Sequence, residues 1–189
     1  MTLSTYTPGL YASFRHQTFS PRQLVPVPSK GLLRIERGAV RTVTWSDRGT
    51  AITLGYWGVG DAVGQPLSGV QPYQIECKSH VEMSYIPANL CDRSLDEIFQ
   101  HIQQTQAFFC MLRSESLRDR LLQLLVLLGK KFGRQVAQGL LIDLRLTHQE
   151  ISESLGITRI TVTRLMAKLE EEGFIDRSRP QYIVLTSRL

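Results

Sequence analysis

Short runs of β-forming residues separated by glycine turns dominate the chain from Lys30 to about Ala88. The runs cover residues 32–36, 39–45, 51–57, 75–78 and 81–86, with turns at Arg37-Gly38 and Asp47-Arg48-Gly49. Strands this short and this evenly spaced predict a small antiparallel sandwich or barrel. The segment before Lys30 contains four prolines and is expected to be irregular, wrapping around the sandwich.

A helical period replaces this pattern after Ser94. Apolar residues recur at three- and four-residue spacings and form one narrow stripe. Such a near-heptad stripe is typical of a two-stranded seam with a second copy, although packing against the sandwich would produce a similar stripe. The stripe predicts a dimer interface made of Leu95, Ile98, Ile102, Thr105, Phe109 and Leu112.

A break in the helical pattern is expected at Ser114, Glu115 and Ser116. Ser116 can cap a new helix, because its hydroxyl accepts from a first-turn amide and Asp119 supplies the acid favoured there. These three residues therefore form a candidate hinge. The helix that follows runs from 117 to about 132 and is apolar enough to be the floor of a second small core, and Gly133 is expected to end it.

The stretch from Leu146 to Gly156 has the pattern of the first helix of a helix-turn-helix. Thr147 and Glu150 form a capping box, in which each side chain accepts from the other residue's amide. Gly156 permits the left-handed turn that stops the helix, and Ile157 can fill the space between this helix and the next.

A second helix is predicted over 158–172, with Thr158 as its cap and Gly173 as its stop. Val162, Leu165, Met166 and Leu169 share one face, while Arg159, Ile160, Thr163 and Arg164 project from the other. This is the layout of a recognition helix that enters a major groove of DNA. Residues 174–177 and 182–185 predict a hairpin, or wing, whose Arg177 and Arg179 can meet the sugar–phosphate backbone. An ordinary three-helix bundle with a β-ribbon is the alternative.

Charge and composition narrow the class of protein. The net charge is +5, and the basic excess lies after residue 110, which suits a polyanionic partner or simply a solvated basic surface. Cys77, Cys91 and Cys110 lack the spacing of a zinc or iron–sulfur site. No apolar stretch approaches the roughly 20 residues of a membrane span, and no secretion signal is apparent, so a cytoplasmic location away from the membrane is expected.

Residues 146–165 resemble the winged helix-turn-helix of the cyclic-AMP receptor / fumarate-nitrate-reductase regulator superfamily. The segment Thr158-Arg159-Ile160-Thr161-Val162-Thr163-Arg164-Leu165 is most similar to the cyanobacterial global nitrogen regulator branch. The resemblance implies an α+β fold with three parts: a truncated antiparallel β-roll, similar to cyclic-nucleotide-binding domains (1–93), a long dimerisation helix (94–115) and a winged helix-turn-helix (116–189). It also implies a homodimer that binds an inverted repeat in double-stranded DNA and, if it is an activator, contacts RNA polymerase.

By this resemblance Arg159 and Arg164 match the base-reading and phosphate-contacting arginines of the family. Ile160 departs from members that carry Glu at this position. Glu accepts from cytosine N4, whereas isoleucine offers only apolar contact, for example to a thymine methyl. The candidate DNA-contacting residues are Thr147, His148, Gln149, Thr158, Arg159, Ile160, Thr161, Thr163, Arg164, Lys168, Arg177 and Arg179.

The effector is less well defined by the sequence. Residues 61–72, which correspond to the family's phosphate-binding cassette, lack its Glu and its Arg, so no cyclic-AMP binding and no cofactor are expected. A 2-oxoglutarate-like metabolite remains an alternative, for which His101 is the nearest helical candidate. Two other classes stay open: a protein-binding adaptor, and a metal-dependent cupin-like enzyme, although the four histidines are scattered and no catalytic motif is present.

Overall fold

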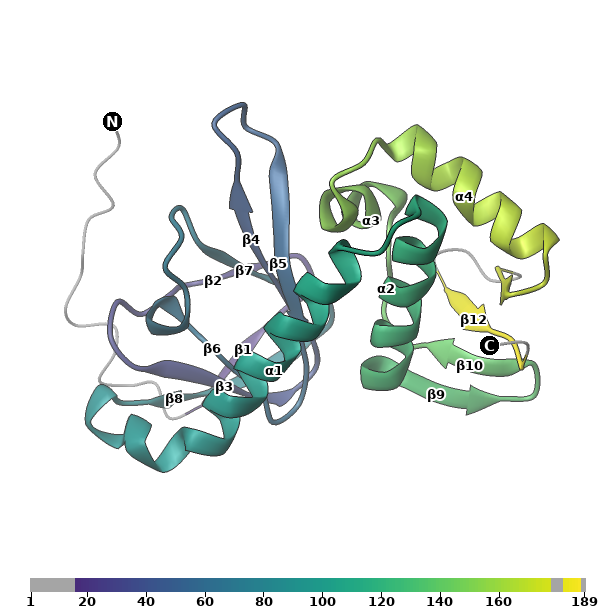
Figure 1. Ribbon diagram of the computed structural model, residues 1–189. Helices are drawn as coiled ribbons and strands as arrows, with labels where there is room; N and C mark the ends of the chain where they lie inside the picture. Colours follow the sequence, from purple (N-terminus) through teal and green to yellow (C-terminus); the bar gives the residue numbers. More distant parts are fainter. Residues whose placement is uncertain (1–15, 178–181, 188–189) are drawn as a thin grey trace.

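The computed structural model describes residues 16–177 and 182–187, apart from the side chains of residues 92 and 93. Its N-terminal half is a sandwich of two four-stranded antiparallel sheets (Figure 1). One sheet has the order β1-β8-β3-β6 and the other the order β2-β7-β4-β5. The strands are β1 (Gln17–Phe19), β2 (Leu24–Val25), β3 (Leu32–Arg37), β4 (Val40–Trp45), β5 (Ala51–Trp57), β6 (Ala62–Val63), β7 (Gln74–Cys77) and β8 (Val81–Ile86).

Alternating inward side chains of both sheets form the sandwich core. Ile35, Val40, Ile75 and Val81 are all completely buried in it. The five predicted strands are present, two with the predicted bounds and three with ends that differ by one residue. The segment before Lys30 is predicted to be irregular, and this prediction is wrong in part. Within it, Gln17–Phe19 pairs with β8 and Leu24–Val25 pairs with β7. Strands of two or three residues carry too little periodicity to be recognised from sequence.

A long helix, α1 (Leu95–Leu112), follows the sandwich and runs diagonally along it towards the second half of the molecule (Figure 1). Two 3-10 helices, η2 (Gln65–Leu67) and η3 (Ala88–Ser94), precede it. The chain then turns at Arg113 and Ser114 into α2 (Leu117–Phe132). The predicted cap is present, since the Ser116 hydroxyl accepts from the Asp119 amide.

The C-terminal half consists of three helices and a four-stranded sheet (Figure 1). Its remaining elements are β9 (Gly133–Val136), β10 (Gly139–Ile142), α3 (His148–Leu155), α4 (Arg159–Glu171), β11 (Ile175–Asp176) and β12 (Ile183–Leu185). The sheet has the order β11-β12-β10-β9, so the predicted wing is present and is extended by a β9–β10 hairpin that the sequence pattern did not reveal. Leu121, Leu124 and Leu125 of α2 are completely buried beneath α3 and α4, as predicted.

These elements confirm the predicted α+β architecture of an antiparallel β-roll, a long helix and a winged helix-turn-helix. Among the described residues, no helix combines the length and the hydropathy that crossing a bilayer demands. The same part of the chain contains no group of three or more His, Cys, Asp or Glu side chains placed to hold a metal ion.

Candidate nucleic-acid interface

Local sequence fixes where the first helix of the candidate interface starts and stops. The Thr147 hydroxyl accepts from the Glu150 amide at 3.2 Å, and Glu150 Oε2 accepts from the Thr147 amide at 2.9 Å, so the predicted capping box is present. Gly156 ends α3 with a φ of 66°, a left-handed conformation that glycine adopts without steric cost. Ile157 packs partly buried against the second core. The turn between α3 and α4 therefore has one defined geometry.

Helix α4 is held against this core by one face only. Val162, Met166 and Leu169 are buried, and Leu165 packs against them half-buried, as the pattern predicted. The Thr158 hydroxyl caps the helix by accepting from the Thr161 amide at 3.2 Å. Because the cap and the apolar face fix α4 in place, the side chains of the opposite face have a set direction.

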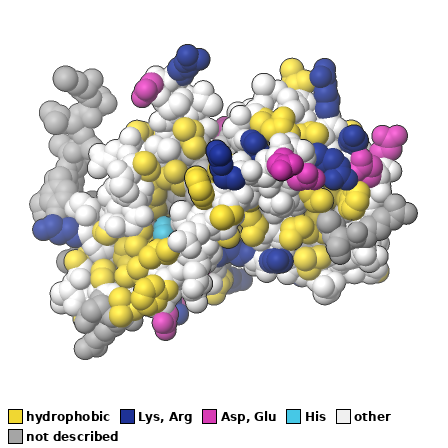
Figure 2. Space-filling view, viewed as in Figure 1, with side chains coloured by type: hydrophobic (Ala, Val, Ile, Leu, Met, Phe, Trp, Pro, Cys, Tyr) yellow, Lys and Arg dark blue, Asp and Glu magenta, His cyan; other side chains and the backbone are white. Residues whose placement is uncertain are grey.

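The opposite face of α4 is open to solvent. Ile160 is 66% exposed, a large value for an isoleucine. The arginines on either side of it and the hydroxyls of the same face are also accessible; the exposed predicted residues are Thr158, Arg159, Ile160, Thr163, Arg164 and Lys168, with Thr161 half-buried. Figure 2 shows cationic side chains among apolar and acidic ones over this part of the surface. The exposed end of the helix thus combines the guanidinium groups of Arg159 and Arg164 with the apolar side chain of Ile160 between them.

The first turn of α3 lies beside this face. His148 Nδ1 is 2.8 Å from Thr163 Oγ1, and that hydroxyl donates to the Arg159 carbonyl at 3.0 Å. Since the hydroxyl proton is used there, the imidazole is the donor of the first bond, which leaves Nε2 unprotonated in the neutral ring. Burial lowers the pKa of His148, and the positive charges of Arg177 and Arg159 lower it further.

The other predicted DNA contacts at α3 and the wing differ in exposure, since Thr147 and Gln149 are exposed and Arg177 is not. Gln149 donates to Glu153 Oε1 at 2.9 Å within α3. Arg177 is half-buried and forms an ion pair with Glu170 of α4, so it helps to hold the wing against the helix. Arg179 lies outside the described residues.

The exposed side of α1 carries four large apolar side chains along one face. Leu95, Phe99, Ile102 and Phe109 are between 46% and 64% exposed, and Phe99 is not part of the stripe predicted from the sequence. These four residues follow spacings of four, three and seven, as in a heptad seam. Hydrophobic side chains gather along the course of α1 in the space-filling view (Figure 2). Of the other residues predicted for the interface, Thr105 is exposed at the edge of this face, and Ile98 and Leu112 are half-buried beside it.

The residues predicted as a hinge lie in the short connection between α1 and α2. Ser114 donates to Gln123 Oε1 at 2.7 Å, and its carbonyl accepts from Arg120 Nε at 2.8 Å. Ser116 is the cap of α2, and Glu115 is exposed between them. The connection is short but is held by side chains of α2.

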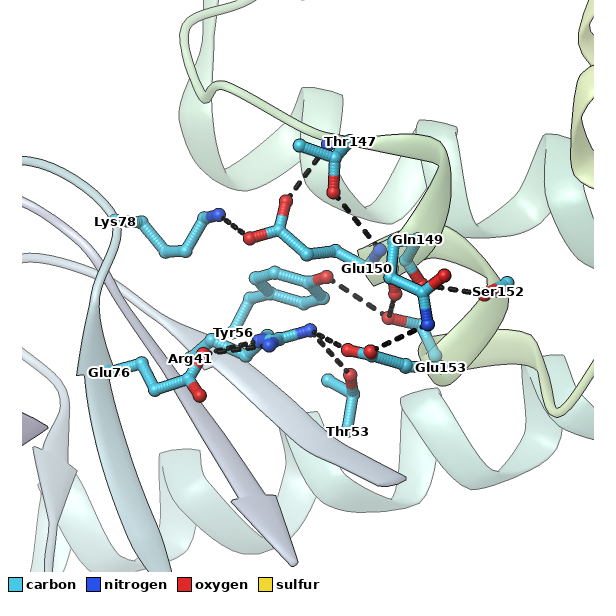
Figure 3. A network of polar contacts seen from close by, with 11 residues as sticks. Arg41, Thr53, Tyr56, Glu76, Lys78, Thr147, Gln149, Glu150, Ser152 and Glu153 are labelled. Atoms are coloured by element: carbon cyan, nitrogen blue, oxygen red, sulfur yellow. Dashed lines mark hydrogen bonds and ion pairs between the residues drawn. The ribbon is translucent and has the colours of Figure 1, made fainter. Parts of the chain in front are cut away.

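A cluster of polar contacts joins the β-roll to α3, and we call it the interdomain cluster (Figure 3). Arg41 donates to Glu76 on the β-roll and to Glu153 on α3, both at 2.7 Å. Lys78 forms an ion pair with Glu150, the residue of the capping box, and the Tyr56 hydroxyl lies 3.0 Å from Ser154 Oγ. The interdomain cluster consists of Arg41, Tyr56, Glu76, Lys78, Glu150, Glu153 and Ser154.

The electrostatics of the interdomain cluster favour its charged form. Burial opposes the charge on Glu150, but hydrogen bonds from Lys78 and the Thr147 amide outweigh it and lower the pKa of Glu150. Burial likewise opposes the charge on Arg41, while hydrogen bonds to the carboxylates of Glu76 and Glu153 favour it, and the pKa of Arg41 is raised. Burial raises the pKa of Tyr56 to about 12, so it remains a neutral phenol. No pattern in the sequence predicts this cluster, because Arg41 and Glu153 are 112 residues apart.

The segment that corresponds to the phosphate-binding cassette does not fit a cyclic nucleotide. Its one charged side chain, Asp61, is buried and accepts from Gln104 and the Gly58 amide, and it forms an ion pair with Lys131. An anion placed here would meet a carboxylate instead of an arginine. His101, the helical candidate for a metabolite contact, is half-buried, with its ring stacked 4.0 Å from that of Trp57 and its Nδ1 3.1 Å from the Ala62 carbonyl oxygen.

Comparisons with known proteins agree with this geometry. Residues 119–188 match the Crp-like helix-turn-helix domain family. Regulatory protein CysR of Synechococcus elongatus is 36% identical over 166 residues, which cover 86% of this chain and 80% of CysR. The global nitrogen regulator of a Nostoc species is 29% identical over 164 residues, or 78% of this chain and 74% of that protein.

A solved structure extends the likeness to the whole fold. It is a CRP/FNR-family transcriptional regulator from Thermus thermophilus, with a TM-score of 0.73 and 26% identity over 91% of this chain and 93% of that one. These relatives are transcriptional regulators and not enzymes, so the expectation that the chain is not an enzyme is confirmed and the cupin-like enzyme is set aside. Taken together, the helix-turn-helix, the β-roll and the relatives that share them show that the chain belongs to the CRP/FNR family of transcriptional regulators.

Proposed function

We propose that the protein is a homodimeric regulator that reads an inverted repeat in double-stranded DNA through the helix at 158–172. The observation that carries this proposal is the exposed end of α4, where Arg159 and Arg164 flank the 66%-exposed Ile160. Arginine forks match the O6 and N7 edge of guanine, and a helix of this width enters the major groove. Basic residues of the second half supply salt-dependent affinity for phosphates.

The apolar face of α1 supports the homodimer. Four large exposed apolar side chains on one helix form the kind of patch that marks a protein interface. Their heptad spacing suits a second copy of the same helix, which makes a two-fold contact. Two recognition helices related by that axis require half-sites about one helical turn apart on one side of the duplex. We assign residues 1–93 to the β-roll, 94–115 to the dimer helix and 116–189 to the DNA-binding part.

Ile160 defines a base preference within each half-site. It has no hydrogen-bonding group, and it lies beside Arg159 on the exposed face of α4. An apolar side chain gains from contact with the C5-methyl group of thymine and leaves the donor of cytosine unsatisfied. We therefore propose that the base pair under Ile160 is T·A.

The protein is proposed to bind DNA without cyclic AMP, because the cassette segment 61–72 contains no arginine to pair with a phosphate and its one charged side chain, Asp61, is a carboxylate. Regulation by a metabolite such as 2-oxoglutarate is a second candidate, suggested by the likeness to global nitrogen regulators. As an activator the protein would also contact RNA polymerase. A protein-binding adaptor would use the same basic surface without any preference among DNA sequences.

Selection of bound sequences from random duplex DNA, with and without cell extract, tests these points together. We expect an inverted repeat to be enriched from the purified protein alone, with T·A at the step under Ile160. An R159A/R164A double variant is the matched control and should enrich no motif. Recovery of random sequences would contradict the proposed function, an invariant G·C pair would contradict the role of Ile160, and a motif that appears only with extract would favour the metabolite-dependent regulator.

A further inference from the structure

A cavity of about 260 Å³ lies where the β-roll, α1 and α2 meet. Its walls come from all three parts, and its lining is mainly apolar, with Tyr56 and Trp57 from β5, Phe108 from α1 and Leu127 from α2. Gln104, Lys130 and Lys131 complete it. The cavity is separate from the cassette segment, because none of residues 61–72 lines it.

Strand β5 forms the β-roll wall of the cavity, and its pairing with β4 is irregular there. The pairing of β4 with β5 shifts between Thr42 and Val43, which leaves Leu54 as an extra, unpaired residue. Gly55 follows it, and a Cβ atom there would come within 2.6 Å of the Trp57 ring. The absence of that atom allows the indole to lie across the strand, where its Nε1 donates to Thr42 Oγ1 at 2.9 Å. This wall is therefore rigid, apolar and aromatic.

The two lysines of the cavity differ in their partners. Lys131 is held by an ion pair with Asp61 and by a hydrogen bond to Gln104. Lys130 is exposed and has no ion-pair partner within the described part of the chain. One cation without a counter-charge at an apolar cavity is complementary to a ligand with one negative charge and an apolar body.

We propose that this cavity binds a small monocarboxylic acid with an aromatic or aliphatic body. The body would replace water against Trp57, Phe108 and Leu127, and the carboxylate would pair with Lys130 at the mouth. The cavity is slightly smaller than the roughly 300 Å³ at the lower end of drug-sized sites, so it suits a ligand of about twelve non-hydrogen atoms. Tyr56 lines this cavity and also belongs to the interdomain cluster. A ligand in the cavity would therefore lie next to the contacts between the β-roll and α3.

Calorimetric titration of the full chain with 4-phenylbutyrate, in the absence of DNA, tests the site independently of the proposed function. We expect a dissociation constant of roughly 0.1–1 mM, and weaker binding of the uncharged 4-phenylbutanamide by about two- to fivefold, the effect of one exposed ion pair. Lys130→Gln should remove that difference. Lys30→Gln, at an exposed lysine outside the cavity, should preserve it.

A second variant tests the location. Ala107 is exposed on α1 and lines the cavity, so Ala107→Phe fills the space without disturbing a buried position, and thermal unfolding checks that the fold is kept. We expect this variant to weaken binding of the acid and of the amide at least tenfold. Absence of binding by the unaltered protein up to roughly 10 mM would overturn the proposal. Equal binding of acid and amide would overturn the carboxylate class, and unchanged binding by Ala107→Phe would overturn the site.

Discussion

Arg41 of the β-roll and Glu153 of α3 form an ion pair across the two halves of the protein, with Nη1 and Oε2 2.7 Å apart. The Arg41 side chain is only 6% exposed and that of Glu153 13%. A charge buried to this extent is costly unless it is paired, so the loss of one partner leaves the other poorly solvated. The orientation of α3 relative to the β-roll therefore depends on residues of both.

Glu153→Ala should lower the free energy of unfolding by about 1–3 kcal/mol, because Arg41 keeps Glu76 but loses its contact on α3. Urea denaturation followed by circular dichroism measures the change. Glu171→Ala, at an exposed position of α4, is the matched control and should stay within about 0.5 kcal/mol of the unaltered protein. Equal free energies of unfolding for the two variants would show that this ion pair does not stabilise the fold.

Arg159→Ala should weaken binding to the selected operator by about 1–3 kcal/mol and affect random DNA less, because a bidentate arginine contact discriminates between bases. Fluorescence anisotropy with labelled operator and scrambled duplexes at one fixed salt concentration measures both affinities. Arg37→Ala removes an exposed arginine of the β-roll and should change neither. Equal losses on the two duplexes would assign Arg159 to the phosphate backbone instead.

Local signals predicted the helix-turn-helix well. The capping box at Thr147, the glycine turn at Gly156 and the apolar face of α4 depend on spacings within a single element, and all are present. The β9–β10 hairpin was missed, because its turn lies at Ala137 and Gln138, without a turn-forming Asn-Gly or Asp-Gly pair. The interdomain cluster was missed for a different reason, since only the tertiary fold brings its charges together.

For helix α1, the spacing of apolar residues alone does not establish which face is exposed. The stripes 95, 98, 102, 105, 109, 112 and 95, 99, 102, 106, 109, 113 both follow a heptad, and the sequence favours the first, because the second contains Gln106 and Arg113. The structure exposes Phe99 and leaves Ile98 half-buried, so the accessible face is centred on the second stripe. Packing against the β-roll, which the sequence leaves undefined, decides between them.

Ile102→Glu should convert the proposed dimer to monomers, because it places a carboxylate at the centre of the exposed face of α1 and, in a two-fold seam, next to its own copy. Sedimentation velocity measures the oligomeric state. Gln100→Glu adds the same charge on another exposed side of the helix and should leave the dimer intact. A dimer that persists in Ile102→Glu would place the interface elsewhere.

Operator affinity should increase as the pH falls from about 8 to 6, and His148 is the expected cause. Burial and the charges of Arg177 and Arg159 lower its pKa below the ordinary 6.5, so the ring is neutral in the free protein at pH 7 and above. Its Nδ1 proton is directed to Thr163, which leaves a lone pair on Nε2. A DNA phosphate beside this ring favours protonation and hence raises its pKa in the complex. Binding then takes up a proton, and log Kd changes with pH by at most about one per unit.

The same lowered pKa makes the opposite contribution to folding. Because His148 resists protonation in the folded protein, its contribution to the free energy of unfolding is complete above pH 6.5. This contribution is lost as the pH falls from 6.5 towards the lowered pKa. Affinity measurements therefore need a check of folding by circular dichroism at each pH. His148→Gln keeps a side chain that can donate to Thr163 without titrating, so it should flatten the pH dependence of operator binding, whereas His80→Gln on the β-roll should leave it unchanged. A slope that persists in His148→Gln would assign the proton to another group.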